Sequence, residues 1–176
     1  MSDLDPIRTA LERATRTVTL KPAFGQRTYG NTATVRGGLA CSIVEGKHSL
    51  VSDVPSGMGG SGQGPSPSML FRSAVSGCLA IGLKMWAARQ NVPVEEVIVS
   101  VETDVDARGQ FGVECDAAPG FEAIRIEIEM VSDAEPTAIE TVVESTLRTS
   151  PMMDAIGGPD AATITTRIRQ TAMEGA

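Results

Sequence analysis

The feature that most constrains this fold is a long apolar run in the middle of the chain, from Met69 to Ala88. Only Arg72 and Lys84 interrupt it with a charge, and apolar residues occupy nearly every side of a helical projection. Ser66-Pro67 supplies an N-cap residue followed by proline at the first helical position, and Pro93 follows the end of the run. We predict a helix of about 24 residues, roughly 36 Å long. Its charges favour a buried core helix over a membrane crossing.

The segments on either side of this run show strand and helix patterns. Residues 26–54 hold short β-type stretches separated by glycine-containing turns, which is typical of an antiparallel meander. Residues 97–105 and 124–130 alternate apolar and polar positions, as half-exposed strands do. Helices are expected over residues 3–17, 135–148 and 151–156, and a closing strand over residues 163–171. The predicted class is α+β, a mainly antiparallel sheet with helices packed on one side.

The length and charge of the chain limit its organisation and partners. At 176 residues we expect a single domain over residues 1–176, with residues 1–25 as an N-terminal helix and extension. Twenty-two acidic against 15 basic residues give a net charge of −7, which argues against a nucleic-acid partner. The first residues lack the basic and apolar pattern of a signal peptide. We therefore expect a cytoplasmic protein that does not bind membranes.

Two polar motifs are poor candidates for a cofactor or metal site. Gly57, Gly59 and Gly62 fit G-x-G-x-x-G, but residues 64–67 separate them from the helix and no βαβ unit follows, so we expect a flexible loop bordering a pocket. His48 is the only histidine, which leaves no His-based metal cluster and makes a hydrolase or transferase the weakest hypothesis. We expect no cofactor and no metal.

The three cysteines, Cys41, Cys78 and Cys115, are widely spaced and form no Cys-x-x-Cys motif. Cys78 lies about three turns inside the predicted helix, beyond the reach of the helix dipole. Its predicted same-face neighbours are apolar or small, namely Ala74, Val75, Ile81 and Gly82. No nearby residue on the helix favours a thiolate, so a reactive thiol needs an arginine from another element or another chain. A buried structural cysteine stays the alternative.

Three stretches of the chain carry a resemblance to a known family. Residues 59–83 combine a glycine-rich loop, a Ser-Pro helix start and the small-residue run Ala74-Val75-Ser76-Gly77-Cys78. Residues 119–121 and 150–154 agree with the same pattern in order and spacing. Together they resemble the OsmC/organic hydroperoxide resistance (OsmC-like) superfamily. The resemblance implies an OsmC-like α+β fold with a long central apolar helix, in which two chains intertwine as a homodimer.

The resemblance also implies a peroxiredoxin-like activity in oxidative stress. In peroxidatic members a thiolate attacks an organic hydroperoxide and becomes a sulfenic acid. The sulfenic acid condenses with a second cysteine to a disulfide, which an external dithiol reduces. Cys78 would be the nucleophile. An arginine from the early strand region assists it in such members, and Arg36 is our candidate, with Arg27 second.

The chain departs from the pattern of peroxidatic relatives at two positions. Ser68 stands where they have a carboxylate that holds the arginine, and Ser150 stands where they have the resolving cysteine. Cys41 or Cys115 would replace that cysteine only within about 4.4 to 6.8 Å Cα separation. Our leading hypothesis is a one-cysteine hydroperoxide reductase that uses an external thiol reductant. The alternative is a non-catalytic homodimer that binds a small apolar molecule near Cys78.

Overall fold

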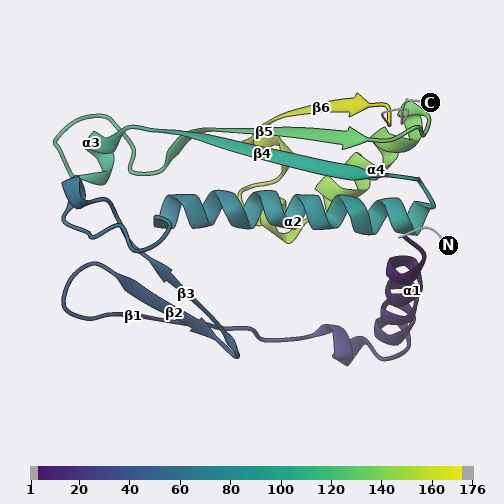
Figure 1. Cartoon of the computed structure of the whole chain (residues 1–176), viewed down its shortest axis with the longest axis horizontal. Coiled ribbons are helices and arrows are strands. Elements are labelled where there is room, and N and C mark those ends of the chain that lie inside the picture. Colours follow the sequence, from purple (N-terminus) through teal and green to yellow (C-terminus); the bar gives the residue numbers. More distant parts are fainter. Residues whose placement is uncertain (1–3, 172–176) are drawn as a thin grey trace, which may run out of the picture. The chain divides into compact units, whose positions relative to one another are not determined.

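The computed structural model describes residues 4–171, and the chain divides into two compact units (Figure 1). We call residues 17–73 the Arg36 unit, and residues 4–16 together with 74–171 the Cys78 unit. Helices α1 (Leu4–Leu20) and α2 (Pro67–Gln90) each begin in one unit and end in the other. The termini of the predicted 1–176 domain, and residue 3 of the predicted first helix, lie outside the described residues.

The sheet of the Cys78 unit has the strand order β4-β5-β6. Its strands are β4 (Glu96–Val105), β5 (Phe121–Val131) and β6 (Thr163–Arg169). β4 pairs with β5 antiparallel, and the short helix α3 (Ala107–Gln110) lies between them in the chain. β5 pairs with β6 in parallel, after the crossover through α4 (Pro136–Thr149) and α5 (Pro151–Ala155). The α+β class is confirmed, but the prediction missed this parallel pair.

The core of the Cys78 unit lies between α2 and the sheet (Figure 1). Val75, Leu79 and Leu83 follow one another at four-residue spacing along α2 and are almost fully buried. Ile126 and Ile128 supply alternate buried positions on β5. Further buried apolar side chains come from α4 and α5, namely Ile139, Val142 and Met153. This packing fixes which face of α2 points away from the sheet.

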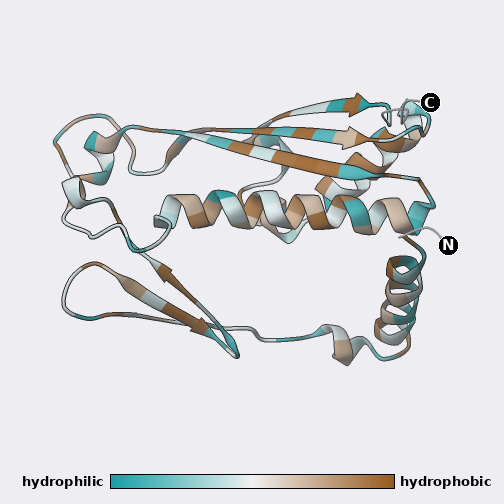
Figure 2. Ribbon diagram, viewed as in Figure 1, coloured by the Kyte–Doolittle hydropathy of each residue, from teal (hydrophilic) through white to brown (hydrophobic). Residues whose placement is uncertain are grey.

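The Arg36 unit contains a three-stranded antiparallel sheet in the order β1-β2-β3. Its strands are β1 (Thr32–Val35), β2 (Cys41–Glu45) and β3 (His48–Ser52), as the meander pattern predicts. Hydrophobic stretches are visible on β2 and β3 in Figure 2. Val44, Leu50 and Val51 are nevertheless exposed, and no apolar side chain among residues 17–73 is buried.

The glycine-rich loop of the Arg36 unit folds around the carboxylate of Asp53. This carboxylate accepts four hydrogen bonds, from the backbone N–H groups of Val54, Ser61 and Gln63 and from the Ser61 hydroxyl. A Cβ at Gly60 would collide with the Val54 carbonyl, so this turn requires glycine. Three backbone N–H groups of residues 54–63 thus bind this buried carboxylate, and the flexibility of the loop stays a prediction.

Within the described residues no helix is long and apolar enough to cross a membrane. The predicted boundaries of α2 agree with the structure at both ends. The predicted first helix is wrong at its end, because α1 continues to Leu20.

Candidate functional site around Cys78

Cys78 lies midway along α2, and its sulfur contacts a residue 72 positions later in the chain. Cys78 Sγ is 3.4 Å from Ser150 Oγ. Ser150 is 6% exposed and connects α4 to α5, where its hydroxyl is the N-cap of α5 and accepts the Met153 N–H at 3.3 Å. Ser150, which the family resemblance places at the position of a resolving cysteine, is therefore in direct contact with Cys78.

The direction of this hydrogen bond depends on the charge of the sulfur. A thiolate has no proton and accepts hydrogen bonds only, so Ser150 must then be the donor. Its single hydroxyl proton is available, because the oxygen meets the Met153 amide as an acceptor. The arrangement therefore offers Cys78 one neutral hydrogen-bond donor.

A pocket of about 340 Å³ opens beside the sulfur, and we call it the Cys78 pocket. Its walls come from α2, α4 and the start of α5. The lining residues are Cys78, Ile81, Gly82, Met85, Trp86, Thr146, Thr149, Ser150 and Pro151. None of these residues carries a charge. The pocket suits a small apolar ligand whose reactive group meets the sulfur.

Close packing of α2 against α4 brings Ser150 to Cys78. A Cβ added to Gly82 would stand 2.9 Å from Thr146 Cγ2, which is tighter than ordinary contact. Thr146 is buried, and its hydroxyl donates to the Val142 carbonyl. Gly82 thus permits the helix approach that places the end of α4 over the sulfur.

Trp86 is a pocket residue that the sequence reasoning missed. Its indole N–H donates to Thr149 Oγ1 at 2.8 Å, and the Arg89 guanidinium lies 5.0 Å from its ring centroid. A signal was present in the sequence, since Trp86 lies eight residues after Cys78 and therefore roughly on the same side of the helix. Of the predicted same-face neighbours of Cys78, Ile81 and Gly82 line its pocket, whereas Ala74 and Val75 do not, and Val75 is buried in the core instead.

The two candidate arginines belong to the Arg36 unit. Arg36 follows β1 and borders a shallow hollow with Thr34, Ala40 and Ser42. Within residues 4–171 Arg36 has no ion-pair partner, whereas Arg27 donates to the Phe24 carbonyl and lies over the Phe24 ring. Of the two arginines, Arg36 is therefore the one whose guanidinium is more available to bind another group. Its pairing with Cys78 stays a prediction.

The other residues that the sequence analysis singled out do not line the Cys78 pocket. All three cysteines are free thiols. Cys41 begins β2 in the Arg36 unit, and Cys115 is exposed in the loop between α3 and β5. Ser68 lies in the first turn of α2, also in the Arg36 unit. His48 is exposed at the start of β3, opposite Glu45.

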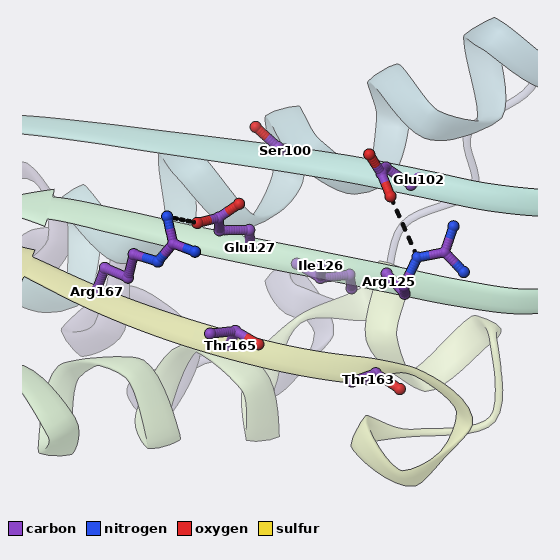
Figure 3. Close-up of a pocket in the computed structure, with 8 residues that line it drawn as sticks. All are labelled: Ser100, Glu102, Arg125, Ile126, Glu127, Thr163, Thr165 and Arg167. Atoms are coloured by element: carbon purple, nitrogen blue, oxygen red, sulfur yellow. Dashed lines mark hydrogen bonds and ion pairs between the residues drawn. The ribbon is translucent and has the colours of Figure 1, made fainter.

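A second hollow, of about 200 Å³, lies on the outer face of the β4-β5-β6 sheet (Figure 3). Arg125 pairs there with Glu102 and with Asp104, and Arg167 pairs with Glu127. The Arg125 guanidinium lowers the pKa of the Asp104 carboxyl through its hydrogen bonds. These charges are exposed and satisfied by one another, so we interpret this hollow as a solvated face.

Comparison with known proteins supports a specific family. A family model described as OsmC-like protein matches residues 60–165, more than half of the chain. The matched region includes Cys78 and Ser150 and begins after Arg36. No curated protein sequence matches the chain.

Solved structures share the fold at low sequence identity. An OsmC-like protein from Mycoplasma pneumoniae is 14% identical with a TM-score of 0.68, over 84% of this chain and 99% of its own. An organic hydroperoxide resistance protein from Elizabethkingia anophelis is 17% identical with a TM-score of 0.61, over 83% and 98%. An organic hydroperoxide resistance protein from Legionella pneumophila is 19% identical with a TM-score of 0.54, over 84% and 100%. These structures show the shared fold, and the match of the family model over more than half of the chain shows that the chain belongs to the OsmC-like family.

Proposed function

We propose that this protein is a thiol-dependent organic hydroperoxide reductase of one-cysteine type, with Cys78 as its nucleophile. The observation that carries the proposal is the position of the Cys78 sulfur, which borders an apolar pocket and meets the Ser150 hydroxyl at 3.4 Å. The names of similar structures, which include organic hydroperoxide resistance proteins, support the same reaction class.

The proposed reaction uses one hydroperoxide and two thiols. The Cys78 thiolate attacks the terminal peroxide oxygen, the O–O bond breaks, and the alcohol leaves with a proton. A first external thiol attacks the resulting sulfenic acid and releases water, which leaves a mixed disulfide on Cys78. A second thiol attacks this disulfide, so the reductant leaves oxidised and Cys78 returns as a thiol. Reduced thiols are maintained in the cytoplasm, where we propose that the protein acts.

Ser150 gives the proposal its one-cysteine form. A hydroxyl cannot form a disulfide, so oxidised Cys78 has no partner at the position where relatives carry the resolving cysteine. The hydroxyl instead donates to the thiolate, as its contact with Met153 leaves its proton free. A charge-assisted hydrogen bond of this kind stabilises the attacking form of the sulfur.

The central test is the consumption of cumene hydroperoxide in the presence of several thiol reductants, followed by stopped-flow kinetics. We expect activity in the wild type and in Cys41→Ser and Cys115→Ser, and its loss in Cys78→Ser. Equal inertness of wild type and Cys78→Ser would show that the reductase proposal is wrong. A Cys78 disulfide to Cys41 or Cys115 would overturn the one-cysteine form alone.

A gain-of-function variant tests the role of position 150. We expect Ser150→Cys to form an intramolecular disulfide with Cys78 after one equivalent of peroxide, because the present side-chain atoms are already 3.4 Å apart. Mass spectrometry of peptides without reduction detects it. Thr149→Cys is the matched control, since Thr149 points to Trp86, and there no disulfide is expected.

Arg36 supplies, in this proposal, the positive charge that the lining of the Cys78 pocket lacks. We expect Arg36→Gln to slow the oxidation of Cys78 by about tenfold or more at neutral pH, because an adjacent cation favours the thiolate. Arg27→Gln is the control, since Arg27 is engaged with Phe24. Equal rates for Arg36→Gln and wild type would remove Arg36 from the site.

We also propose that the working form is a homodimer. Two exposed apolar surfaces support it: α2 presents Ile81, which is 64% exposed, and the β1-β2-β3 sheet presents Leu50. Three-stranded sheets need a packed face for stability. Sedimentation analysis at micromolar concentration should give twice the chain mass, and Leu50→Glu should lower it. A monomeric wild type would contradict this part.

A second candidate function is a non-catalytic carrier of a small apolar molecule in the Cys78 pocket. The uncharged lining of the pocket favours it. A carrier should bind an apolar alcohol equally in wild type and in Cys78→Ala, as isothermal titration measures, and should consume no peroxide in either. Peroxide consumption by the wild type that is absent in Cys78→Ala identifies the reductase instead.

A further inference from the structure

Trp86 is held firmly at the Cys78 pocket, and the proposed chemistry leaves it without a role. Its indole N–H donates to Thr149 Oγ1 at 2.8 Å. The Thr149 hydroxyl donates its own proton to the Ser145 carbonyl at 2.7 Å, so its oxygen remains free to accept the indole. The Arg89 guanidinium covers the ring at 5.0 Å from the centroid. The ring is therefore restrained both at its N–H edge and over its face.

Two consecutive residues bind the indole and the thiol. Thr149 holds Trp86, and the next residue, Ser150, contacts Cys78 Sγ. Side chains on a helix tilt toward its N-terminus, so Trp86 leans over the turn that contains Gly82. Gly82 has no side chain to oppose the ring. The indole and the sulfur therefore border the same pocket, and each is held there by one of two adjacent residues at the end of α4.

We propose that Trp86 is a specificity-determining residue, and that it selects hydroperoxides whose organic group carries a planar aryl ring. This inference rests on the proposed reductase function. The organic group attached to the peroxide must occupy the Cys78 pocket while its terminal oxygen meets the sulfur. A flat ring beside the indole gains contact area and an aromatic interaction that a compact alkyl group does not. Trp86 therefore discriminates between substrates without taking part in oxygen transfer.

The kinetic test compares cumene hydroperoxide with tert-butyl hydroperoxide. We expect the aryl-to-alkyl ratio of the rate constants for Cys78 oxidation to fall by about two- to tenfold in Trp86→Leu. Thr149→Val keeps the ring but removes its acceptor, and it should lower the ratio less. If Trp86→Leu fails to fold, the aryl-to-alkyl ratio of Thr149→Val tests the inference instead. Phe111→Leu is the control, because Phe111 is an exposed aromatic residue of the same unit outside the pocket. An unchanged ratio in the folded variants overturns the inference.

A binding test without turnover separates this inference from the reductase proposal. Trp86 is the only tryptophan, so the emission of Cys78→Ser reports on this pocket directly. We expect 2-phenyl-2-propanol to change the emission saturably, and at lower concentration than tert-butanol. If peroxide reduction is absent but this response is present, the reductase proposal fails and the aryl preference of the pocket stands. If peroxide is reduced but neither alcohol changes the emission, the role of Trp86 is overturned.

Discussion

The two units of this protein are stabilised in different ways. Every buried apolar side chain within residues 4–171 belongs to the Cys78 unit, where α2, α4 and β5 enclose a core. In the Arg36 unit only Ser52 and Asp53 are buried, and both are polar. The first unit thus holds the thiol on a packed scaffold. The second unit orders its loop by hydrogen bonds and leaves the apolar side chains of its sheet uncovered. We infer that the Arg36 unit depends on further contacts for its stability, and the predictions below test this difference.

The largest expected effect comes from the core of the Cys78 unit. Leu79→Ala should lower the free energy of unfolding by about 2–5 kcal/mol, because it leaves a cavity beneath fully buried neighbours. Leu50→Ala in the Arg36 unit should change it by about 0.5 kcal/mol or less if that residue stays exposed. Urea unfolding measures both. A large loss in Leu50→Ala at a concentration where the protein is monomeric would break the comparison, since Leu50 would then be covered within its own chain, whereas a large loss only in the dimer would show that a partner chain covers it.

A smaller effect is expected where α2 approaches α4. Gly82→Ala should cost about 1–3 kcal/mol, because the new methyl group meets Thr146 at 2.9 Å. Gly77→Ala is the matched control on the same helix: nothing lies within 4 Å of its added Cβ, and alanine favours helix by up to about 1 kcal/mol. Thermal unfolding distinguishes the two. Equal changes in stability for Gly82→Ala and Gly77→Ala would mean that the close approach of α2 to α4 does not require glycine at position 82.

The smallest expected effect concerns the Asp53 loop of the Arg36 unit. Hydrogen bonds from the Gln63 backbone, and then from Val54 and Ser61, lower the pKa of Asp53 from 3.8 to about 2. Because the folded-state pKa is lowered, this stabilisation is present above about pH 4 and is lost as the pH falls towards 2. Asp53→Asn should therefore unfold at lower urea concentration at pH 7, and its difference from wild type should narrow below pH 4.

Asp116→Asn is the control for this pH dependence, because Asp116 is exposed in the Cys78 unit. It should follow the wild type at each pH. A difference between wild type and Asp53→Asn that stays constant from pH 7 to pH 3 would contradict the role of the Asp53 carboxylate. Limited proteolysis of residues 55–66 provides a local measurement of the same loop.

Local signals predicted the elements of this fold better than its long-range contacts. The start of α2 was predictable because Ser66-Pro67 is a cap signal in adjacent residues, and the residues after Gln90 carry the end signal. The parallel pairing of β5 with β6 was not, since the period-two pattern is the same for either direction of pairing. Strand periodicity thus located these strands without giving their topology.

The candidate site shows the same limit. The residues around Cys78 identified the helix face of the pocket, but the contact with Ser150 joins residues 72 positions apart. Only the family resemblance pointed to the contact of Ser150 with Cys78, whereas its bond with the Met153 N–H corresponds to a Ser-Pro cap signal like the one at the start of α2. The Asp53 network was also missed, because three of its four donors are backbone N–H groups, which no side-chain pattern identifies.

The Ser150 contact also has a stereochemical consequence for the Cys78 sulfur. One flank of the sulfur faces an oxygen that already holds the Met153 amide at the start of α5, a helix of five residues. The Ser150 oxygen therefore occupies one direction around the sulfur, and a reagent that enters the Cys78 pocket meets the sulfur beside this oxygen. A short helix far away in the sequence thus restricts the directions from which a reagent can reach this thiol.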